Sequence, residues 1–294
     1  MVSQTKDMTS RIRKAFVAAL KSSSWVDPSI REDAINRLNN ITVYAGSPGR
    51  RLDPQFVEEF YKPLPDVPLN RTFPSWIKAR SLSTHYFWAD QSNVLYDEEE
   101  VNAYYFPSGR YILVPTAIIH RPFLYADVPR TLNYGALGMI IAHEFMHPFD
   151  VNHTRHEYWE TDKFKKEYIT RALCLRRSHR SVLSMTSHPD SLNDNVDSEN
   201  IADFVGAMLA YKAFSSLPPN HRNVKLAGLN LTSEQLFFIS HCLKWCADKS
   251  VPTARYAPYR SRCIVPLRNM PEFSSAFNCK TGTIMNPQQK CSFW

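Results

Sequence analysis

The chain has 294 residues, of which 44% are hydrophobic and 13% aromatic, so it is long enough to bury a large core and does not have the composition of a disordered protein. Its formal net charge of +7 could suit nucleic acid, but the Lys and Arg residues are scattered and form no RNA-binding motif, so we expect no nucleic-acid partner. No apolar run approaches the roughly 18 residues of a membrane span, and the first residues lack the apolar stretch of a signal peptide.

The first hundred residues are expected to form a helical segment. Residues 8–20 repeat apolar side chains at helical spacing, which predicts an amphipathic helix. Such a basic helix can lie on a membrane, but its mixed polar face favours packing against a core. A second helix is predicted from Asp27 to about Asn39, because Asp is a good N-cap and Pro28 suits the first turn. Residues 45–75 contain six prolines and are expected to form loops around a short helix near 56–61.

The second part of the chain is expected to begin with strands and continue with helices. Residues 101–115 are rich in β-forming residues on both sides of Pro107-Ser108-Gly109, which predicts a β-hairpin. A helix is expected after Asn133, a polar loop over 177–198, and further helices from Glu199 and over 233–246. The remaining residues are rich in Pro and Arg and are expected to be irregular.

The stretch from Leu137 to His147 is apolar except for three residues. On a helix, His143 and His147 project from one face, where two imidazoles can occupy adjacent corners of a zinc tetrahedron. Glu144 is offset from that face, but it can reach a water held at the metal and take its proton. A chance match to the His-Glu-x-x-His pattern is the alternative. Because these polar residues on a buried helix need partners that a metal would supply, we predict one zinc ion.

A zinc peptidase site needs a third protein ligand. Glu199 and Asp203 are also four residues apart, on the face of a predicted helix that its hydrophobic stripe leaves open. Glu199 would bind zinc, while Asp203 would accept the second ring N–H of a histidine ligand. Alone, this spacing is more often a solvated helix face, but the upstream motif makes a joint site the stronger hypothesis.

Cysteines and glycosylation sequons favour an oxidising environment. The six cysteines all lie in the second half of the chain, and Asn-x-Ser/Thr sequons begin at Asn40, Asn70, Asn152 and Asn230. Since this conflicts with the absence of a signal peptide, we expect that the chain lacks an N-terminal portion that would carry its targeting signal. Six cysteines allow fifteen pairings, among which spacing does not choose.

Several stretches together resemble the C-terminal, catalytic part of the neprilysin and endothelin-converting-enzyme family of zinc metallopeptidases. They are Val101 to Tyr105, Leu132 to Glu144, Glu199 to Asp203, Gly228 to Phe238, Lys244 to Cys246, and Met285 to Trp294. The resemblance implies a mainly α fold with a small β-sheet: a thermolysin-like zincin domain over residues 101–294, preceded by the helical segment 1–100. It also implies an extracellular or cell-surface protein that cuts peptides on the amino side of hydrophobic residues. The oligomeric state stays open.

The family's functional residues can be carried over by position. His143, His147 and Glu199 match the zinc ligands, Glu144 the general base, and Asp203 the carboxylate that holds a ligand histidine. The remaining matches are Asn102 and Ala103 for binding the substrate backbone, Arg262 for a substrate carbonyl, and Phe123, Met139, Ile140 and Trp245 for the hydrophobic specificity pocket. For these last four residues, ordinary core packing is the alternative.

The resemblance also bears on the cysteines. It implies a disulfide between Cys174 and Cys291. Cys246 and Cys279 match positions whose partners lie in a region that this chain lacks, and Cys242 and Cys263 match no family role.

Two residues depart from the family pattern. Tyr256 occupies the position of a histidine that donates to the oxyanion of the tetrahedral intermediate, although a tyrosine hydroxyl can make the same kind of donation. Pro148 follows His147, and inside a helix it would clash with the carbonyl of Glu144, at a cost of about 3 kcal/mol. The resemblance also implies that this chain lacks the lobe that would cover the active site. These departures and the missing lobe motivate an alternative: a zinc-binding protein that binds peptides without cutting them, or a truncated product without independent stability.

Overall fold

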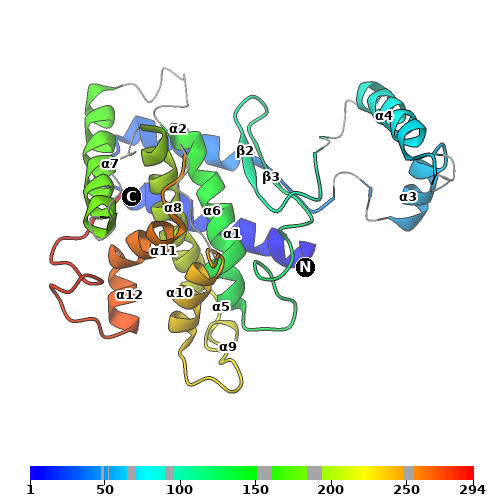
Figure 1. Cartoon of the computed structure of the whole chain (residues 1–294). Coiled ribbons are helices and arrows are strands. Elements are labelled where there is room, and N and C mark those ends of the chain that lie inside the picture. Colours follow the sequence, from blue (N-terminus) through cyan, green and yellow to red (C-terminus); the bar gives the residue numbers. More distant parts are fainter. Residues whose placement is uncertain are drawn as a thin grey trace.

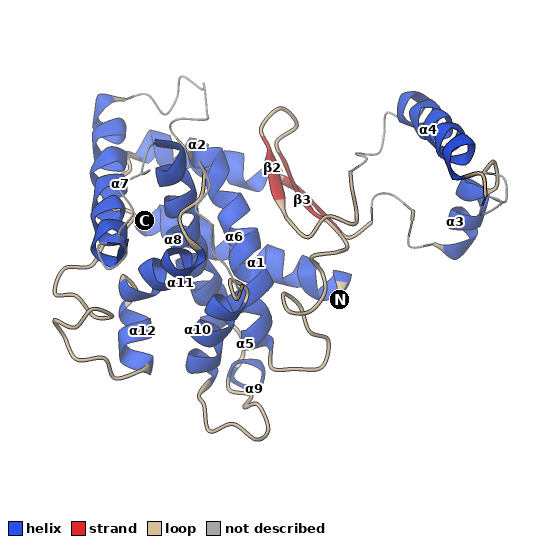
Figure 2. Cartoon of the chain, viewed as in Figure 1, coloured by secondary structure: helices blue, strands red, loops and turns tan. Residues whose placement is uncertain are grey.

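The structure is a computed structural model that describes residues 1–47, 50–51, 53–64, 70–89, 94, 96–150, 161–183, 194–247 and 255–294. It is mainly helical with one small β-sheet, as predicted (Figure 2). None of the helices in the described ranges is long and apolar enough to cross a membrane.

A layer of long helices forms the core. The helix α1 (Val2–Ser22) extends the predicted helix at both ends and buries Ile12, Phe16 and Leu20. It packs against α6 (Met139–Met146) and α8 (Asp194–Ser215), the pair of helices in closest contact, while α2 (Pro28–Asn39) packs against α1 (Figure 1). The predicted active-site residues on α6 and α8 are therefore held by the most densely packed part of the fold.

The sheet lies beside this core and has the strand order β1-β3-β2. Strands β2 (Tyr104–Phe106) and β3 (Tyr111–Val114) form the predicted hairpin, with Tyr105 opposite Ile112. Strand β1 (Thr42–Ala45) was not predicted, because four residues beside a proline-rich stretch give no alternation to recognise; it pairs in parallel with β3. Since α1, α2 and β1 share one core with later elements, the division at residue 100 stays a prediction.

Two helices stand away from this body (Figure 1). The predicted short helix α3 (Pro54–Tyr61) begins at Asp53, whose carboxylate accepts the backbone N–H groups of Gln55 and Phe56. The expectation of loops up to residue 75 is wrong at its end, because α4 runs from Thr72 to Ala89. Its apolar residues are spread around the helix rather than along one stripe, so no helical period was visible. Its exposed large apolar side chains are Phe73, Trp76, Ile77, Phe87 and Trp88.

The second half of the chain contains more helix than expected. The predicted loop over 177–198 is wrong where the structure describes it, since α7 (Asp162–Leu183) covers its start and α8 its end. The polar residues of this stretch suggested a loop, but they instead join the two helices through polar contacts. Among these are two hydrogen bonds from Arg176 Nε to Asp197, at 2.9 and 3.1 Å. Residues 184–193 lie outside the described ranges.

The smaller helices complete the catalytic half. Helix α10 (Ser233–Leu243) begins where it was predicted, with a capping box between Thr232 and Gln235, and ends three residues before the predicted end. The end of the chain is not irregular as expected, because it contains α11 (Tyr259–Arg268) and α12 (Pro271–Ala276). Two further short helices are α5 (Arg130–Asn133) and α9 (Pro219–Arg222).

Two disulfides hold these helices. Cys174 on α7 is joined to Cys291 near the C-terminus, the pair that the family resemblance implies. Cys242 on α10 is joined to Cys263 on α11, a pair that the sequence did not predict. Cys246 and Cys279 are not disulfide-bonded.

Candidate active site

The His-Glu-x-x-His segment changes helical type as it crosses the site. A π-helical turn, η1 (Tyr134–Gly138), leads into α6, which ends at Met146, and a 3-10 turn, η2 (His147–Phe149), follows. Pro148 therefore lies in the first turn of η2 rather than inside α6, so the predicted clash with the Glu144 carbonyl is not imposed. The two motif histidines still meet, with their Nε2 atoms 3.1 Å apart.

Helix α8 brings the second pair of polar residues to the same place. Glu199 Oε2 lies 3.0 Å from His143 Nε2 and 3.8 Å from His147 Nε2. This approach depends on Gly206, because a Cβ atom there would lie 2.9 Å from the backbone nitrogen of His143 and 3.0 Å from the Met139 carbonyl oxygen. A glycine thus lets α8 lie directly against the backbone of α6.

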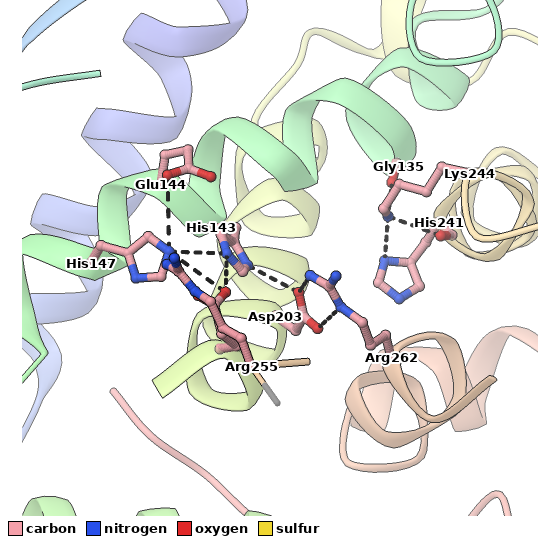
Figure 3. A network of polar contacts seen from close by, with 10 residues as sticks. Gly135, His143, Glu144, His147, Asp203, His241, Lys244, Arg255 and Arg262 are labelled. Atoms are coloured by element: carbon pink, nitrogen blue, oxygen red, sulfur yellow. Dashed lines mark hydrogen bonds and ion pairs between the residues drawn. The ribbon is translucent and has the colours of Figure 1, made fainter. Parts of the chain in front are cut away.

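Asp203 connects this pair of helices to α11 (Figure 3). Its buried carboxylate lies 3.0 Å from His143 Nδ1 and accepts two bonds from Arg262, at 2.7 Å from Nε and 2.8 Å from Nη2. Burial raises the pKa of Asp203, but Arg262 and His143 outweigh it and hold that pKa well below its usual range. Asp203 is therefore an anion that fixes the direction of the His143 ring.

The ligand atoms of His143, His147 and Glu199 lie close together, and their separations test whether a metal ion would fit between them. If His143 Nδ1–H donates to Asp203, its Nε2 lone pair faces the Glu199 carboxylate, whose buried Oε2 has no hydrogen-bond donor among the described residues. Burial lowers the pKa of His143, but the neighbouring Asp203 and Glu199 carboxylates raise it to about 10, so this cluster of acceptors favours a positive charge. Tetrahedral ligands at about 2.0–2.1 Å from zinc stand about 3.3 Å apart. The separations of 3.0, 3.1 and 3.8 Å fit that spacing.

Glu144 lies beside these three residues and completes the polar group of the motif. Its Oε2 is 3.9 Å from His147 Nε2, and the ligand atoms of His143, Glu144 and His147 lie within 4.8 Å of one another. Glu199 lies nearer to His143 than Glu144 does, which favours Glu199 over Glu144 as a third metal ligand. Burial raises the pKa of Glu144 to about 7, the range that suits a group exchanging protons near neutral pH.

Arg255 is a site residue that the sequence analysis missed. Its Nε donates to Glu199 Oε1 at 2.5 Å, although its own side chain is 61% exposed (Figure 3). The pair fixes the second oxygen of a carboxylate whose first oxygen faces the histidines. Its position directly before Tyr256 was the only available signal, and an arginine in a stretch rich in arginines did not stand out.

Two cavities meet at this polar group. The first, of about 400 Å³, is lined by all four predicted pocket residues, which are Phe123, Met139, Ile140 and Trp245. The second, of about 350 Å³, runs along β2 and is lined by Ala103, His147 and Arg255 among others. Asn102, Glu144 and Tyr256 line both, so a chain laid across Glu144 would have side-chain space on either side.

The remaining predicted residues also reach the site. Tyr256 presents its ring 4.6 Å from the guanidinium of Arg262, and burial raises the pKa of its hydroxyl. Arg262 lines the first cavity while it holds Asp203, and it lies 4.0 Å from the centre of the Trp245 ring. Apart from the distant disulfide, every sequence-predicted site residue thus lines one of the two cavities or, in the case of Glu199, contacts a residue that does.

Comparison with known proteins identifies the family. Residues 102–293 match the sequence profile described as "Peptidase family M13". The chain belongs to this family, which is that of the neprilysin and endothelin-converting-enzyme zinc metallopeptidases. The match begins at Asn102 and ends one residue before the C-terminus, so it includes every predicted site residue.

Curated M13 relatives align with almost the whole chain. Neprilysin-3 of Drosophila melanogaster is 33% identical over 98% of this chain and 39% of its own length. The endothelin-converting enzyme homolog of Locusta migratoria is 30% identical over 98% and 42%, and membrane metallo-endopeptidase-like 1 of Mus musculus is 29% identical over 99% and 41%. The chain thus spans about two fifths of the length of the curated relatives it matches.

Solved structures support the fold. The Haemonchus galactose containing glycoprotein complex superposes with a TM-score of 0.81 at 23% identity, over 100% of this chain and 49% of that one. A zinc metalloprotease of Mycobacterium tuberculosis in complex with an inhibitor gives 0.77 at 22% identity, over 99% and 47%. The arrangement of helices and strands is therefore that of a zincin peptidase of this family.

Proposed function

We propose that this chain is the catalytic part of a zinc-dependent endopeptidase. The observation that carries the proposal is the convergence of His143, His147 and Glu199 on one point, with Glu144 beside it at the junction of two cavities. A zinc ion held there would polarise a scissile carbonyl and acidify a water. Family membership supports zinc dependence in general.

Other residues of the site have separate roles in the proposed reaction. Glu144 takes a proton from water and passes it to the leaving amine, a role that suits its raised pKa. Asp203 keeps the His143 ring in place, and Arg262, with Tyr256, steadies the charge that develops on the scissile carbonyl oxygen. Asn102 and Ala103 bind the backbone of an extended peptide, and the first cavity takes the hydrophobic side chain after the scissile bond.

We also propose an extracellular or cell-surface location. The disulfides and the sequons support it, since Asn40, Asn70 and Asn230 are exposed and can accept a glycan. Asn152 lies outside the described residues. The name of one relative, membrane metallo-endopeptidase-like 1, points the same way. The partner in this proposal is a peptide substrate.

A second candidate function is peptide binding without hydrolysis. The observation that favours it is the contact of Arg255 with Glu199, which places a cation next to a ligand carboxylate. The positive charge of Arg255 so close to the metal would lower the affinity of the Glu199 carboxylate for zinc. Tyr256 in place of the family histidine points in the same direction.

The test is hydrolysis of a quenched fluorescent peptide by protein of known zinc content. Cleavage that is lost with a chelator and restored by zinc supports the peptidase, and we expect Glu144→Gln to abolish it while zinc stays bound. Hydrolysis that survives Glu144→Gln would remove the proposed mechanism. Stoichiometric zinc with peptide binding but no cleavage favours the second candidate, and recovery of cleavage in Tyr256→His would then locate the defect at the oxyanion.

A further inference from the structure

A lysine is built into the apolar wall of the first cavity. Lys244, directly after the end of α10, lines this cavity together with Ile118, Phe123, Met139, Ile140 and Trp245. Its side chain is 91% shielded from solvent, because only 9% of its surface is exposed. A buried cation costs free energy unless something compensates its charge.

The partners of this ammonium group are all neutral. Lys244 Nζ donates to the carbonyl oxygens of His241 at 2.9 Å and Gly135 at 3.1 Å, and it lies 3.1 Å from His241 Nδ1 (Figure 3). The described part of the chain contains no ion pair between Lys244 and a carboxylate. These contacts satisfy the hydrogen-bonding capacity of the Lys244 ammonium group, but they do not neutralise its charge.

The other charged groups of the cavity contact residues other than Lys244. Asp203 is held by Arg262 and His143, and Glu144 faces the metal-binding residues. The Lys244 ammonium lies 5.2 Å from the centre of the Trp245 ring, on which Arg262 also lies. Burial lowers the pKa of Lys244 well below its ordinary value of 10.5, and the opposing effect of the Asp203 charge does not restore it.

We propose that Lys244 makes the first cavity a binding site for a side chain that ends in a carboxylate, so that the enzyme accepts glutamate after the scissile bond. The methylene groups of the glutamate would lie along Phe123 and Met139, and its carboxylate would supply the negative charge that Lys244 lacks. This inference rests on the proposed peptidase function, and it extends the expected preference for hydrophobic residues to an acidic one.

The experiment measures binding, so that it is independent of catalysis. Three fluorescent peptides, identical except for Glu, Gln or Leu after the scissile bond, are titrated by anisotropy into zinc-loaded Glu144→Gln protein. Close pairs of opposite charge at an interface couple by about 1.5–7 kcal/mol, so we expect the Glu peptide to bind about ten-fold or more tightly than the Gln peptide. Equal affinities for these two isosteric peptides overturn the inference without any further variant.

Two added substitutions assign the effect to Lys244. Lys244→Met in the same protein is expected to remove the preference of Glu over Gln, whereas the matched control Lys225→Met, at an exposed lysine, is expected to keep it. A preference that survives in a folded Lys244→Met protein overturns the assignment. Failure of the wild-type chain to hydrolyse any peptide, with the binding preference intact, counts only against the peptidase proposal. Hydrolysis of the Leu peptide without any binding preference counts only against Lys244.

Discussion

Substitution of Asp203 separates two functions that one carboxylate performs. Asp203→Asn keeps an oxygen that can accept from His143 Nδ1, but it removes the only carboxylate bonded to the buried guanidinium of Arg262 in the described structure. Breaking a buried ion pair by removing one partner costs about 3–5 kcal/mol. Asp203→Ala removes the ring acceptor as well. Loss of such an acceptor lowers metal affinity by about ten- to a hundred-fold.

Two measurements follow from this difference. Urea unfolding of the zinc-free proteins should show both variants destabilised by about 3–5 kcal/mol. Competition with a chromophoric chelator should show zinc affinity reduced more in Asp203→Ala than in Asp203→Asn. The matched control is Asp197→Asn on the same helix, which breaks a pair with Arg176 instead of the pair with Arg262. Unchanged zinc affinity in Asp203→Ala would refute the claim that this carboxylate orients the ligand.

Three further predictions concern the frame of the site. Gly206→Ala should destabilise the fold by about 1–3 kcal/mol and weaken zinc binding, because the new Cβ meets the His143 backbone. The control is Gly138→Ala, whose Cβ would come close only to the flexible Met8 side chain, at 3.0 Å from Sδ, and would touch its other neighbours at ordinary contact distances of 3.5 Å or more. Equal effects of the two substitutions would contradict the reasoning. Burial lowers the pKa of His179 from 6.5 to about 4, so the unfolded chain binds more protons between these values and stability should rise with pH across that window, by about 3 kcal/mol in total. Unfolding of His179→Phe at pH 4.5 and 7 should show this rise removed, and an unchanged rise would assign it elsewhere. Replacing Cys242 and Cys263 together by alanine should lower the free energy of unfolding by about 3 kcal/mol, since the disulfide spans 21 residues. An unchanged urea midpoint would show that packing alone holds α10 against α11.

The sequence was most informative where chemistry and helical spacing coincide. His143, His147, Glu199 and Asp203 were predicted from two four-residue spacings, and the structure places all four within hydrogen-bonding or near-ligand distance. The close packing of α6 against α8 could not be predicted, because the need for glycine at position 206 is visible only once the backbone of α6 is seen beside it.

Elements without a clear period were missed. The apolar residues of α4 are spread around the helix, and the C-terminal end of α7 carries so many polar residues that it was predicted as part of a loop. Lys244 and Arg255 were missed for a different reason: each looks like an ordinary surface cation in the sequence, and only the fold shows one inside a cavity and the other against a ligand carboxylate.

The outward helix α4 has a practical consequence for anyone who prepares this chain. Five large apolar side chains on one 18-residue helix are between 48% and 71% exposed. A surface of this kind tends to associate with whatever apolar material is available, including other copies of the chain. Concentrated samples should therefore scatter light and lose material on hydrophobic resins, and polar replacements at Phe73 and Trp88 offer a direct route to protein that stays in solution for the assays above.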